Sequence, residues 1–336
     1  MVYTEIKEVK GRKYYYRVVS VRKGRKVEKK RVYLGVDLDK KALLEKESEA
    51  DKELRLLSSL LSEEERAFLE EVKKKYYNEP KENLENRYEA FCSQFTYDSD
   101  AIEGNTLTLQ QTSLLLFDNV VPASKSMREI NEALNHKKAF DFILNYKEDI
   151  NKQFILDLHS FIVKETLRKD LESQIGKFRT VQVYIRGAKW TPPKPEDVPN
   201  DMKTLLAWYS QNQKNQKVFR VQEIHQNSPA QKIRKDFQVL GNAKHFRHKK
   251  KLHPLILAAY FHTAFERIHP FIDGNGRVGR LLMNFILHKN GYPMINIPNK
   301  IKRRYYSALE KAHLEGDLRP FIELLIYVLK NSQVLV

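Results

Sequence analysis

The sequence is poor in the residues that build disulfides, metal clusters and membrane spans. Cys92 is the single cysteine among 336 residues, which excludes an intrachain disulfide and a cysteine-based zinc site. No apolar run approaches the roughly 20 residues that cross a bilayer. The opening stretch MVYTEIKEVKGRKYYYR also lacks the apolar segment of a secretory signal peptide. We therefore expect a cytoplasmic protein without a membrane span.

The net charge of +17 is concentrated in two segments. Residues 1–33 hold 12 Lys and Arg against 3 Asp and Glu, and residues 213–251 hold 11 against 2, so each segment carries +9. The rest of the chain is nearly neutral. This pattern predicts two attached surfaces for an acidic partner, either a protein or nucleic acid, rather than a fold that binds nucleic acid throughout.

Hydrophobic spacing divides the chain into three parts. Residues 3–34 alternate β-branched or aromatic residues with charges, which predicts a three-stranded antiparallel meander in a basic module over 1–36. Helical spacing follows in a linker region over 37–80 and in a mainly α domain over 81–336. In that domain we expect helices near 82–98, 108–117, 127–146 and 151–168, a β-hairpin over 181–193 that turns near Gly187, and a basic insertion over 213–251.

The stretch HPFIDGNGR, residues 269–277, joins two predicted helices and is built to bind an anion. Gly274 and Gly276 allow positive φ and leave no side chain above the backbone. The loop N–H groups and those that open the next helix can therefore reach a phosphate. Arg277 and Arg280 lie three apart in the first turn of that helix, where two cations favour a polyphosphate. The alternative is a glycine-rich turn with solvated arginines.

Three more side chains of this loop suit phosphate chemistry. Asp273 offers a hard oxygen ligand for Mg²⁺ or Mn²⁺ beside substrate phosphates. His269 has an ordinary pKa near working pH, so its neutral imidazole can take a proton from an attacking hydroxyl. Asn275 can hold either the loop or a phosphate oxygen. Together these residues predict a catalytic loop over 269–280.

This loop resembles the signature of the Fic family. HPFIDGNGR followed by Arg280 matches His-x-Phe-x-(Asp/Glu)-Gly-Asn-Gly-Arg-x-x-Arg without departure, and the sequence around it resembles Fic proteins over roughly residues 85–330. The resemblance implies a Fic-type helical domain in which the hairpin 181–193 is a flap that pins the target segment by strand-like pairing. It also implies transfer of AMP from ATP to a hydroxyl of a target protein, with self-modification. Gly274 and Arg277 argue against the kinase-like Doc branch.

The resemblance assigns a role to each residue of the loop. His269 would be the base and Asp273 the ligand of Mg²⁺ or Mn²⁺. The phosphates would be bound by Gly274, Asn275 and Gly276 and clamped by Arg277 and Arg280. The implied partners are ATP and a target protein, and a homodimer is one implied assembly because members of the family often form dimers.

A second stretch, SDAIEGN over residues 99–105, resembles the inhibitory motif (Ser/Thr)-x-x-x-Glu-(Gly/Asn) of the same family. The resemblance places Glu103 against Arg280, where its carboxylate would compete with phosphate for the cation. The alternative is a helix that ends at Gly104 with Glu103 in solvent. The leading hypothesis is therefore an autoinhibited protein adenylyltransferase.

Two other functions remain as alternatives. On the same fold, the enzyme would remove AMP from modified proteins, and Glu103 would orient the water. In the other, the chain is a nucleic-acid-associated regulator that uses its basic segments and retains a vestigial site. Because the motif is intact, it argues against a vestigial site and against a purely structural loop.

Overall fold

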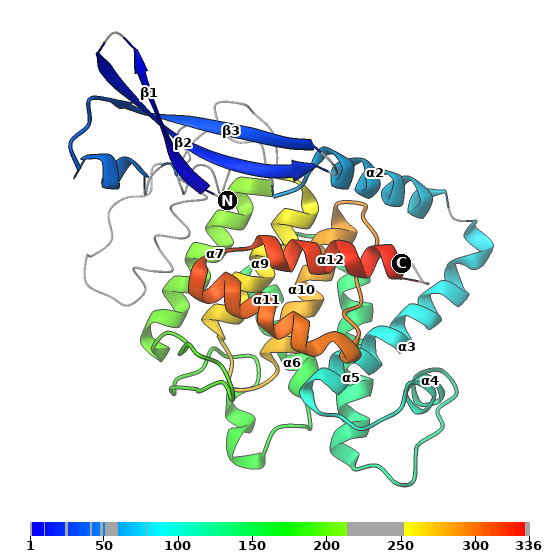
Figure 1. Cartoon of the computed structure of the whole chain (residues 1–336). Helices are drawn as coiled ribbons and strands as arrows, with labels where there is room; N and C mark the ends of the chain where they lie inside the picture. Colours follow the sequence, from blue (N-terminus) through cyan, green and yellow to red (C-terminus); the bar gives the residue numbers. More distant parts are fainter. Residues whose placement is uncertain are drawn as a thin grey trace. The chain divides into compact units, whose positions relative to one another are not determined.

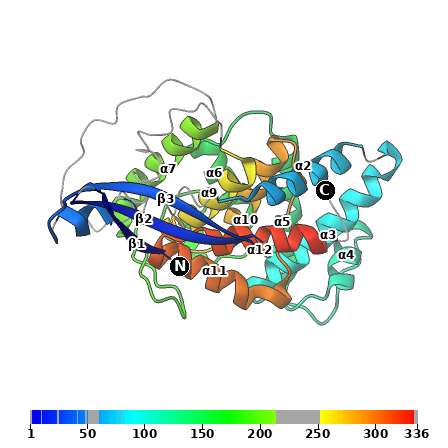
Figure 2. The same cartoon turned by 45° about the horizontal axis from the view of Figure 1, so that its top comes forward.

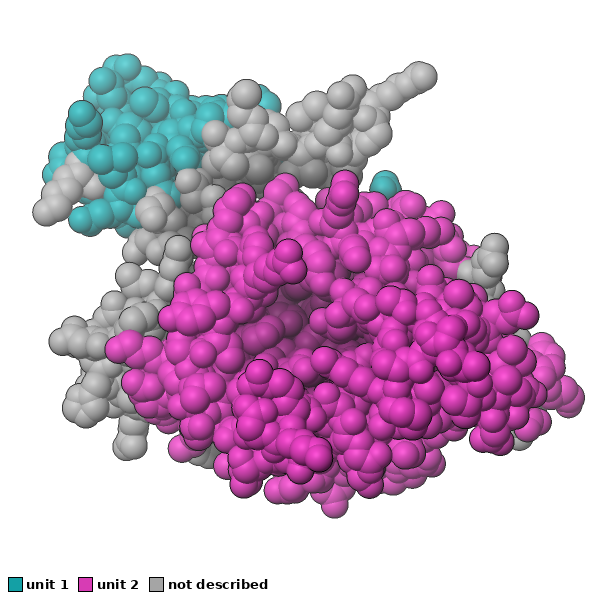
Figure 3. All heavy atoms as spheres, turned by 90° about the horizontal axis from the view of Figure 1, so that it is seen from below, with its two compact units in different colours: residues 1–66 teal, residues 67–336 magenta. Residues whose placement is uncertain are grey.

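The computed structural model describes residues 2–9, 11–23, 26–40, 42–47, 50, 60–78, 80–213 and 252–332. The chain divides into two compact units, residues 1–66 and residues 67–336 (Figure 3). The basic insertion predicted over 213–251 lies outside the described residues, apart from Gln213. No helix in the described ranges is both long enough and apolar enough to cross a membrane.

The first unit contains the three-stranded antiparallel sheet that the alternation predicts. Its strands run in the order β1 (Val2–Val9), β2 (Arg12–Lys23) and β3 (Lys26–Val36). A bulge between Tyr15 and Tyr16 shifts the register of β2 against β3. Tyr15 and Leu34 from one face of the sheet form a small buried cluster with Ala50. In the predicted linker region, residues 42–47 are helical and α2 covers Glu63–Tyr77.

The second unit is helical, as the mainly α prediction requires (Figure 1). Its longer helices are α3 (Leu84–Glu103), α4 (Leu109–Phe117), α5 (Met127–Asn145), α6 (Lys152–Val163), α7 (Val198–Gln213), α9 (Pro254–Ile268), α10 (Asn275–Lys289), α11 (Lys302–Glu315) and α12 (Arg319–Asn331). Short 3₁₀ turns cover Lys81–Asn83, Lys169–Gln174, Pro195–Asp197 and Asn299–Ile301.

Helices α9 and α10 lie at the centre of this unit and pack against each other (Figure 2). Helix α10 is flanked by α3, α5 and α6, and α9 is flanked by α7, α11 and α12. Both central helices are buried over most of their length, because their apolar residues are not confined to one stripe. The turn between α9 and α10 therefore starts and ends on rigid, buried elements.

Two predicted helices end elsewhere than expected. Helix α3 runs to Glu103 rather than to residue 98, because Gly104 is the first residue in the left-handed region, with φ 106°. Ser99 and Glu103, four residues apart, consequently share one face of α3. Helix α6 stops at Val163 rather than at residue 168, because Glu165 adopts φ 58° and breaks the helical path.

The predicted hairpin over 181–193 turns as expected but forms no strands. The chain turns at Arg186–Gly187, where Gly187 has φ 80°, and the segments on both sides are irregular. Side chains replace the strand ladder: Gln182 Nε2 donates to Pro192 O at 3.1 Å, and Arg179 Nη1 donates to Val181 O at 3.0 Å. Two prolines at the end of the second arm have no N–H to pair. The prediction of β-structure there is wrong, and the segment is a loop.

Candidate active site

The loop that carries the predicted catalytic residues connects the C-terminus of α9 to the N-terminus of α10. His269 is the first residue after α9 and adopts φ 50°, an uncommon value for a side chain of this size. Gly274, with φ 80°, precedes the first residue of α10. A Cβ on Gly274 would lie 2.9 Å from Val163 Cγ1 of α6. Glycine is therefore required here by both conformation and packing.

Asn275 holds the loop closed. Its Oδ1 accepts a hydrogen bond from Phe271 N at 2.9 Å, and its Nδ2 donates to Phe271 O at 2.8 Å. The sequence allowed the Asn275 side chain either to hold the loop or to bind a phosphate oxygen, and in the structure it holds the loop. A contact from this residue to phosphate would use its backbone.

His269 is oriented by the helix that it terminates. Its Nδ1 lies 3.3 Å from Glu266 O, and a carbonyl only accepts, which assigns the proton to Nδ1 and leaves Nε2 as the acceptor. Burial lowers the pKa of the imidazole to about 4, against an opposing effect of the Glu266 carbonyl. The ring is consequently neutral at physiological pH, as a general base must be.

Arg280 reaches across to α3. Its Nε donates to Ser99 Oγ at 3.0 Å, and its Nη2 donates to Ser99 O at 2.9 Å and to Glu103 Oε1 at 2.8 Å. Burial alone would lower the pKa of this guanidinium, but the adjacent Glu103 carboxylate outweighs that effect and raises it. The alternative predicted Glu103 in solvent, and its side chain is indeed 38% exposed. Helix α3 does end at Gly104, yet Glu103 is paired.

The Glu103 carboxylate lies directly against the start of α10. A Cβ added to Gly276 would overlap Glu103 Oε1. Gly274 caps α10 without a side-chain hydrogen bond, so the positive end of the helix faces this carboxylate. A carboxylate from α3 therefore lies beside the first turn of α10, the place where the sequence predicts a phosphate.

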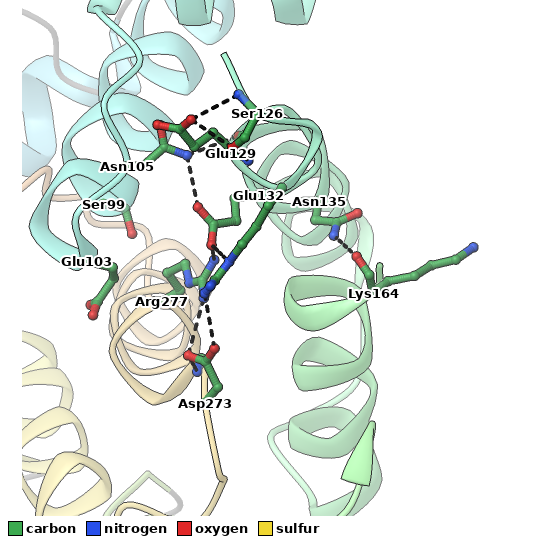
Figure 4. A network of polar contacts seen from close by, with 12 residues as sticks. Ser99, Glu103, Asn105, Ser126, Glu129, Glu132, Asn135, Lys164, Asp273 and Arg277 are labelled. Carbon is green, nitrogen blue, oxygen red and sulfur yellow. Dashed lines mark hydrogen bonds and ion pairs between the residues drawn. The ribbon is translucent and has the colours of Figure 1, made fainter. Parts of the chain in front are cut away.

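Arg277 faces α5 rather than α3. Its Nη1 lies 3.6 Å from Glu132 Oε1, and its Nη2 lies 3.5 Å from Asp273 Oδ1 (Figure 4). The same Glu132 accepts a hydrogen bond from Asn105 Nδ2 at 3.0 Å. Glu132 thus connects the turn after Glu103 to the second cation of the loop. The two arginines contact different carboxylates, although they begin the same helix.

Asp273 is the candidate metal ligand. Its side chain is 38% exposed, and its Oδ2 lies 3.7 Å from Nη2 of Arg128 on α5. No cluster of three or more His, Cys, Asp or Glu side chains in the described part of the chain could hold a metal alone. A single accessible carboxylate beside a phosphate site fits Mg²⁺, which keeps several waters and binds through substrate oxygens. The residues present therefore fit that ion.

Two fully buried carboxyls lie beside this polar network. Burial raises the pKa of Glu266 to about 8, and burial raises the pKa of Asp100 to about 7. Neither Glu266 Oε1 nor the Asp100 carboxyl oxygens have a hydrogen-bond partner among the described residues. Glu266 is consequently held largely as a neutral acid at physiological pH, whereas Asp100 is divided between its neutral and ionised forms.

Arg179 joins the catalytic loop to the loop over 181–193. Its Nε donates to His269 O at 2.8 Å, and its Nη2 donates to Pro193 O at 2.5 Å. Its backbone N–H also donates to Pro270 O at 2.9 Å. Because one buried guanidinium reaches both segments, the loop that would hold a target is fixed to the base that would act on it.

Sequence reasoning missed the side chains that support the motif, which are Arg128, Glu132, Arg179 and Glu266. All four lie outside the loop, and Glu266 resembles an ordinary helix acid. The sequence signal for Arg179 was the stretch GKFR, residues 176–179, which also resembles Fic proteins.

Comparisons with known proteins agree with this geometry. Residues 149–287 match the Fic/DOC family model. The chain is 35% identical over 232 residues to Protein adenylyltransferase Fic of Drosophila persimilis, an alignment that covers 68% of this chain and 37% of that relative. The chain therefore spans little more than a third of the length of that relative.

Two solved structures share the fold. A Fic-domain-containing signaling protein from Bacteroides thetaiotaomicron VPI-5482 is 27% identical with a TM-score of 0.61, over 78% of this chain and 92% of that one. Fic-1 from Caenorhabditis elegans is 26% identical with a TM-score of 0.60, over 88% of this chain and 76% of that one.

Proposed function

Because residues 149–287 form a domain of the Fic/DOC family, we propose that the chain is a protein adenylyltransferase. It transfers AMP from ATP to a hydroxyl side chain of a target protein and also to itself. The observation that carries this proposal is the placement of the neutral His269 imidazole at one end of a glycine loop whose other end opens α10. A base and a phosphate site on one short loop suit phosphoryl chemistry.

His269 is the general base of the reaction. The target hydroxyl attacks the α-phosphorus, its proton passes to Nε2, and the bond between the α-phosphorus and the bridging oxygen breaks so that pyrophosphate leaves. The Nδ1 contact with Glu266 O keeps Nε2 directed at the site. Base catalysis of this kind contributes about 10²–10⁴-fold.

The phosphates occupy the N-terminal end of α10. The N–H groups of its first turn and the guanidinium of Arg280 supply charge-assisted hydrogen bonds to phosphate oxygens. Arg277 adds a second cation from the α5 side. Asp273 would hold Mg²⁺ or Mn²⁺, which supplies charge neutralisation of the phosphates when bound.

The enzyme is autoinhibited by Glu103. Its carboxylate pairs with Arg280 and lies over Gly276, where a terminal phosphate would otherwise bind. ATP must therefore displace it or bind in a non-productive position. The pair is half-exposed at Glu103, with 38% of that side chain accessible, so displacement does not require unfolding of α3.

A second candidate function is the removal of AMP from modified proteins. The exposed part of the Glu103 carboxylate supports it, because a carboxylate that reaches solvent beside the site can orient a water. In that reaction, loss of Glu103 would abolish activity instead of raising it. The two candidates therefore differ in the reaction that Glu103 serves: its loss should speed AMP transfer in the first and abolish AMP removal in the second.

Self-modification with labelled ATP tests the proposed function. The wild-type chain should incorporate label slowly, and His269→Ala should incorporate none while it still binds ATP through the α10 N-terminus. Glu89→Gln, a change at an exposed acid on α3, is the matched control and should behave as wild type. Equal incorporation by the wild type and His269→Ala would refute the assignment of the base.

A further inference from the structure

One face of the sheet in the first unit carries a small apolar cluster, and the other displays aromatic and basic side chains around the buried Val18. Residues opposite each other on neighbouring strands share a face. Tyr15 and Leu34 belong to the first face, where Val32, Leu38 and Leu43 pack around their cluster. The register pairs Glu5 with Tyr16 and Tyr16 with Tyr33, which places these three on the other face.

Four tyrosines occupy this second face, which we call the tyrosine face: Tyr3, Tyr14, Tyr16 and Tyr33. The rings of Tyr16 and Tyr33 have centroids 5.4 Å apart, and those of Tyr14 and Tyr33 are 6.5 Å apart. Tyr33 is 53% exposed. The rings of Tyr14, Tyr33 and Tyr16 thus form a row across two strands.

Cations accompany the tyrosines. Lys7 Nζ lies 5.6 Å from the Tyr16 ring centroid, and Lys29 Nζ lies 5.8 Å from that of Tyr3. Arg31 also projects from this face, where Glu5 accepts a 2.9 Å hydrogen bond from its Nε. Among the described side chains of the tyrosine face, Lys7, Lys29 and Arg31 accompany the single acid Glu5, and Arg12 pairs with Asp37 at the end of the face. The segment over residues 1–33 carries a net +9. Such a surface complements a polyanion.

We propose that the tyrosine face binds single-stranded nucleic acid, with the bases stacked on the tyrosines and the phosphates beside Lys7, Lys29 and Arg31. The cations alone would suit any polyanion, but the exposed rings favour a single strand over a duplex. Base faces are accessible in a single strand and hidden in a duplex, and sheets that present aromatic residues bind single strands by stacking. This activity is independent of AMP transfer, because none of its residues belongs to the second unit.

The competing explanation is structural, because cross-strand aromatic pairs also stabilise sheets. Substitution of Tyr33 distinguishes sheet stabilisation from nucleic-acid binding. Tyr33 contacts both Tyr14 and Tyr16, but more than half of it is exposed, so it offers the most accessible stacking surface of the row. Tyr33→Ala should therefore weaken binding about tenfold, since stacking on one aromatic contributes a factor of this order, while the melting temperature changes little.

The test uses the full-length chain and a short fluorescein-labelled oligothymidine, with anisotropy as the readout. Single-strand affinity should fall log-linearly with salt, and Lys29→Gln should reduce the slope by about 0.7 for one lost phosphate contact. Lys138→Gln, an equal charge change at an exposed site on α5, should leave both affinity and slope unchanged. His269→Ala should bind as wild type, which separates this result from any failure of the proposed catalysis.

Four outcomes would overturn the proposal: no binding at low salt, tighter binding to a duplex of the same length, unchanged affinity in Tyr33→Ala, or binding to anionic vesicles but not to the oligonucleotide. Tighter duplex binding would mean recognition through phosphates alone. If Tyr33→Ala loses its fold, Tyr33→Ser and Lys7→Gln apply the same test at positions with 53% and 54% exposure.

Discussion

The Glu103 carboxylate accepts a 2.8 Å hydrogen bond from Arg280 Nη2, although 177 residues separate the two in the chain. The contact brings the C-terminal end of α3 against the N-terminal end of α10, and Ser99 on the same face of α3 adds two more hydrogen bonds. A carboxylate beside a helix N-terminus and a buried guanidinium imitates a bound phosphate. Control and catalysis would therefore share one anion position.

The turn that follows Glu103 should influence activity through Asn105. Its Nδ2 donates to Glu129 O and to Glu132 Oε2, each at 3.0 Å. Asn105→Ala removes these bonds and loosens the end of α3, so self-modification should rise, but less than in Glu103→Gly. Initial rates measure the effect. Asn145→Ala, which removes a comparable bond from an exposed amide, is the control, and equal rates in the two variants would contradict the prediction.

The metal requirement should depend on Asp273. Asp273→Asn keeps the oxygen that accepts the Gly274 N–H at 2.6 Å but loses the charge that would hold Mg²⁺. We expect transfer to fall about a hundredfold, because metal neutralisation of phosphates contributes several kcal/mol. Binding of Mn²⁺ in the presence of a non-hydrolysable ATP analogue should weaken in parallel. Full activity in excess chelator would refute this role.

The pH profile should reflect the buried base. Burial lowers the pKa of His269 to about 4, so the imidazole stays neutral as the pH falls through the ordinary histidine range. We expect kcat/KM to be flat from about pH 8 to pH 6 and to fall only below about pH 5, since that parameter follows the free enzyme. A limb near the ordinary pKa of about 6.5 would show that the base is solvated. The measurement is self-modification rate across this range.

Stability should depend on pH through Glu266. Its pKa is raised by burial to about 8, whereas an unfolded glutamate titrates near 4.5. Between these values the unfolded chain releases a proton that the folded chain keeps, so the contribution of Glu266 to stability falls as the pH rises. Glu266→Gln removes this effect, and its stability relative to wild type should increase from about pH 5 to pH 8. Urea unfolding at several pH values measures it, and parallel profiles for the two proteins would contradict the assigned burial.

The sequence predicts the catalytic loop well because its chemistry is local. The turn into α10 requires a positive φ at Gly274, which glycine adopts readily. His269 and Asp273 lie on the same short connection, so their spacing in the sequence determines their proximity. The three-stranded sheet and the mainly helical domain were confirmed for a similar reason, since both follow from the periodicity of neighbouring residues.

The surroundings of the loop could not be predicted, because they depend on tertiary packing. Glu132 contacts Arg277 only because α5 packs on α10, and no spacing in the sequence relates the two. The loop over 181–193 alternates like a strand, yet the Arg179 guanidinium takes carbonyls that a ladder would use. Local propensity gives way there to one buried side chain.

The central claim is that Glu103 restrains AMP transfer by occupying Arg280, and Glu103→Gly tests it most directly. Loss of a charge-assisted hydrogen bond frees the cation for phosphate, so the rate should rise about 10- to 100-fold. Glu103→Gln should rise less, and the double variant Glu103→Gly/His269→Ala should stay inactive. Melting temperature should change little, because Glu103 is partly exposed and the buried Arg280 keeps its two hydrogen bonds to Ser99.

The measurement is the initial rate of label transfer from ATP onto the chain itself, for the wild type and Glu103→Gly at equal concentration. The account predicts faster incorporation in Glu103→Gly, abolished again by His269→Ala. A folded Glu103→Gly variant that is no faster than the wild type would contradict autoinhibition by the Glu103–Arg280 pair.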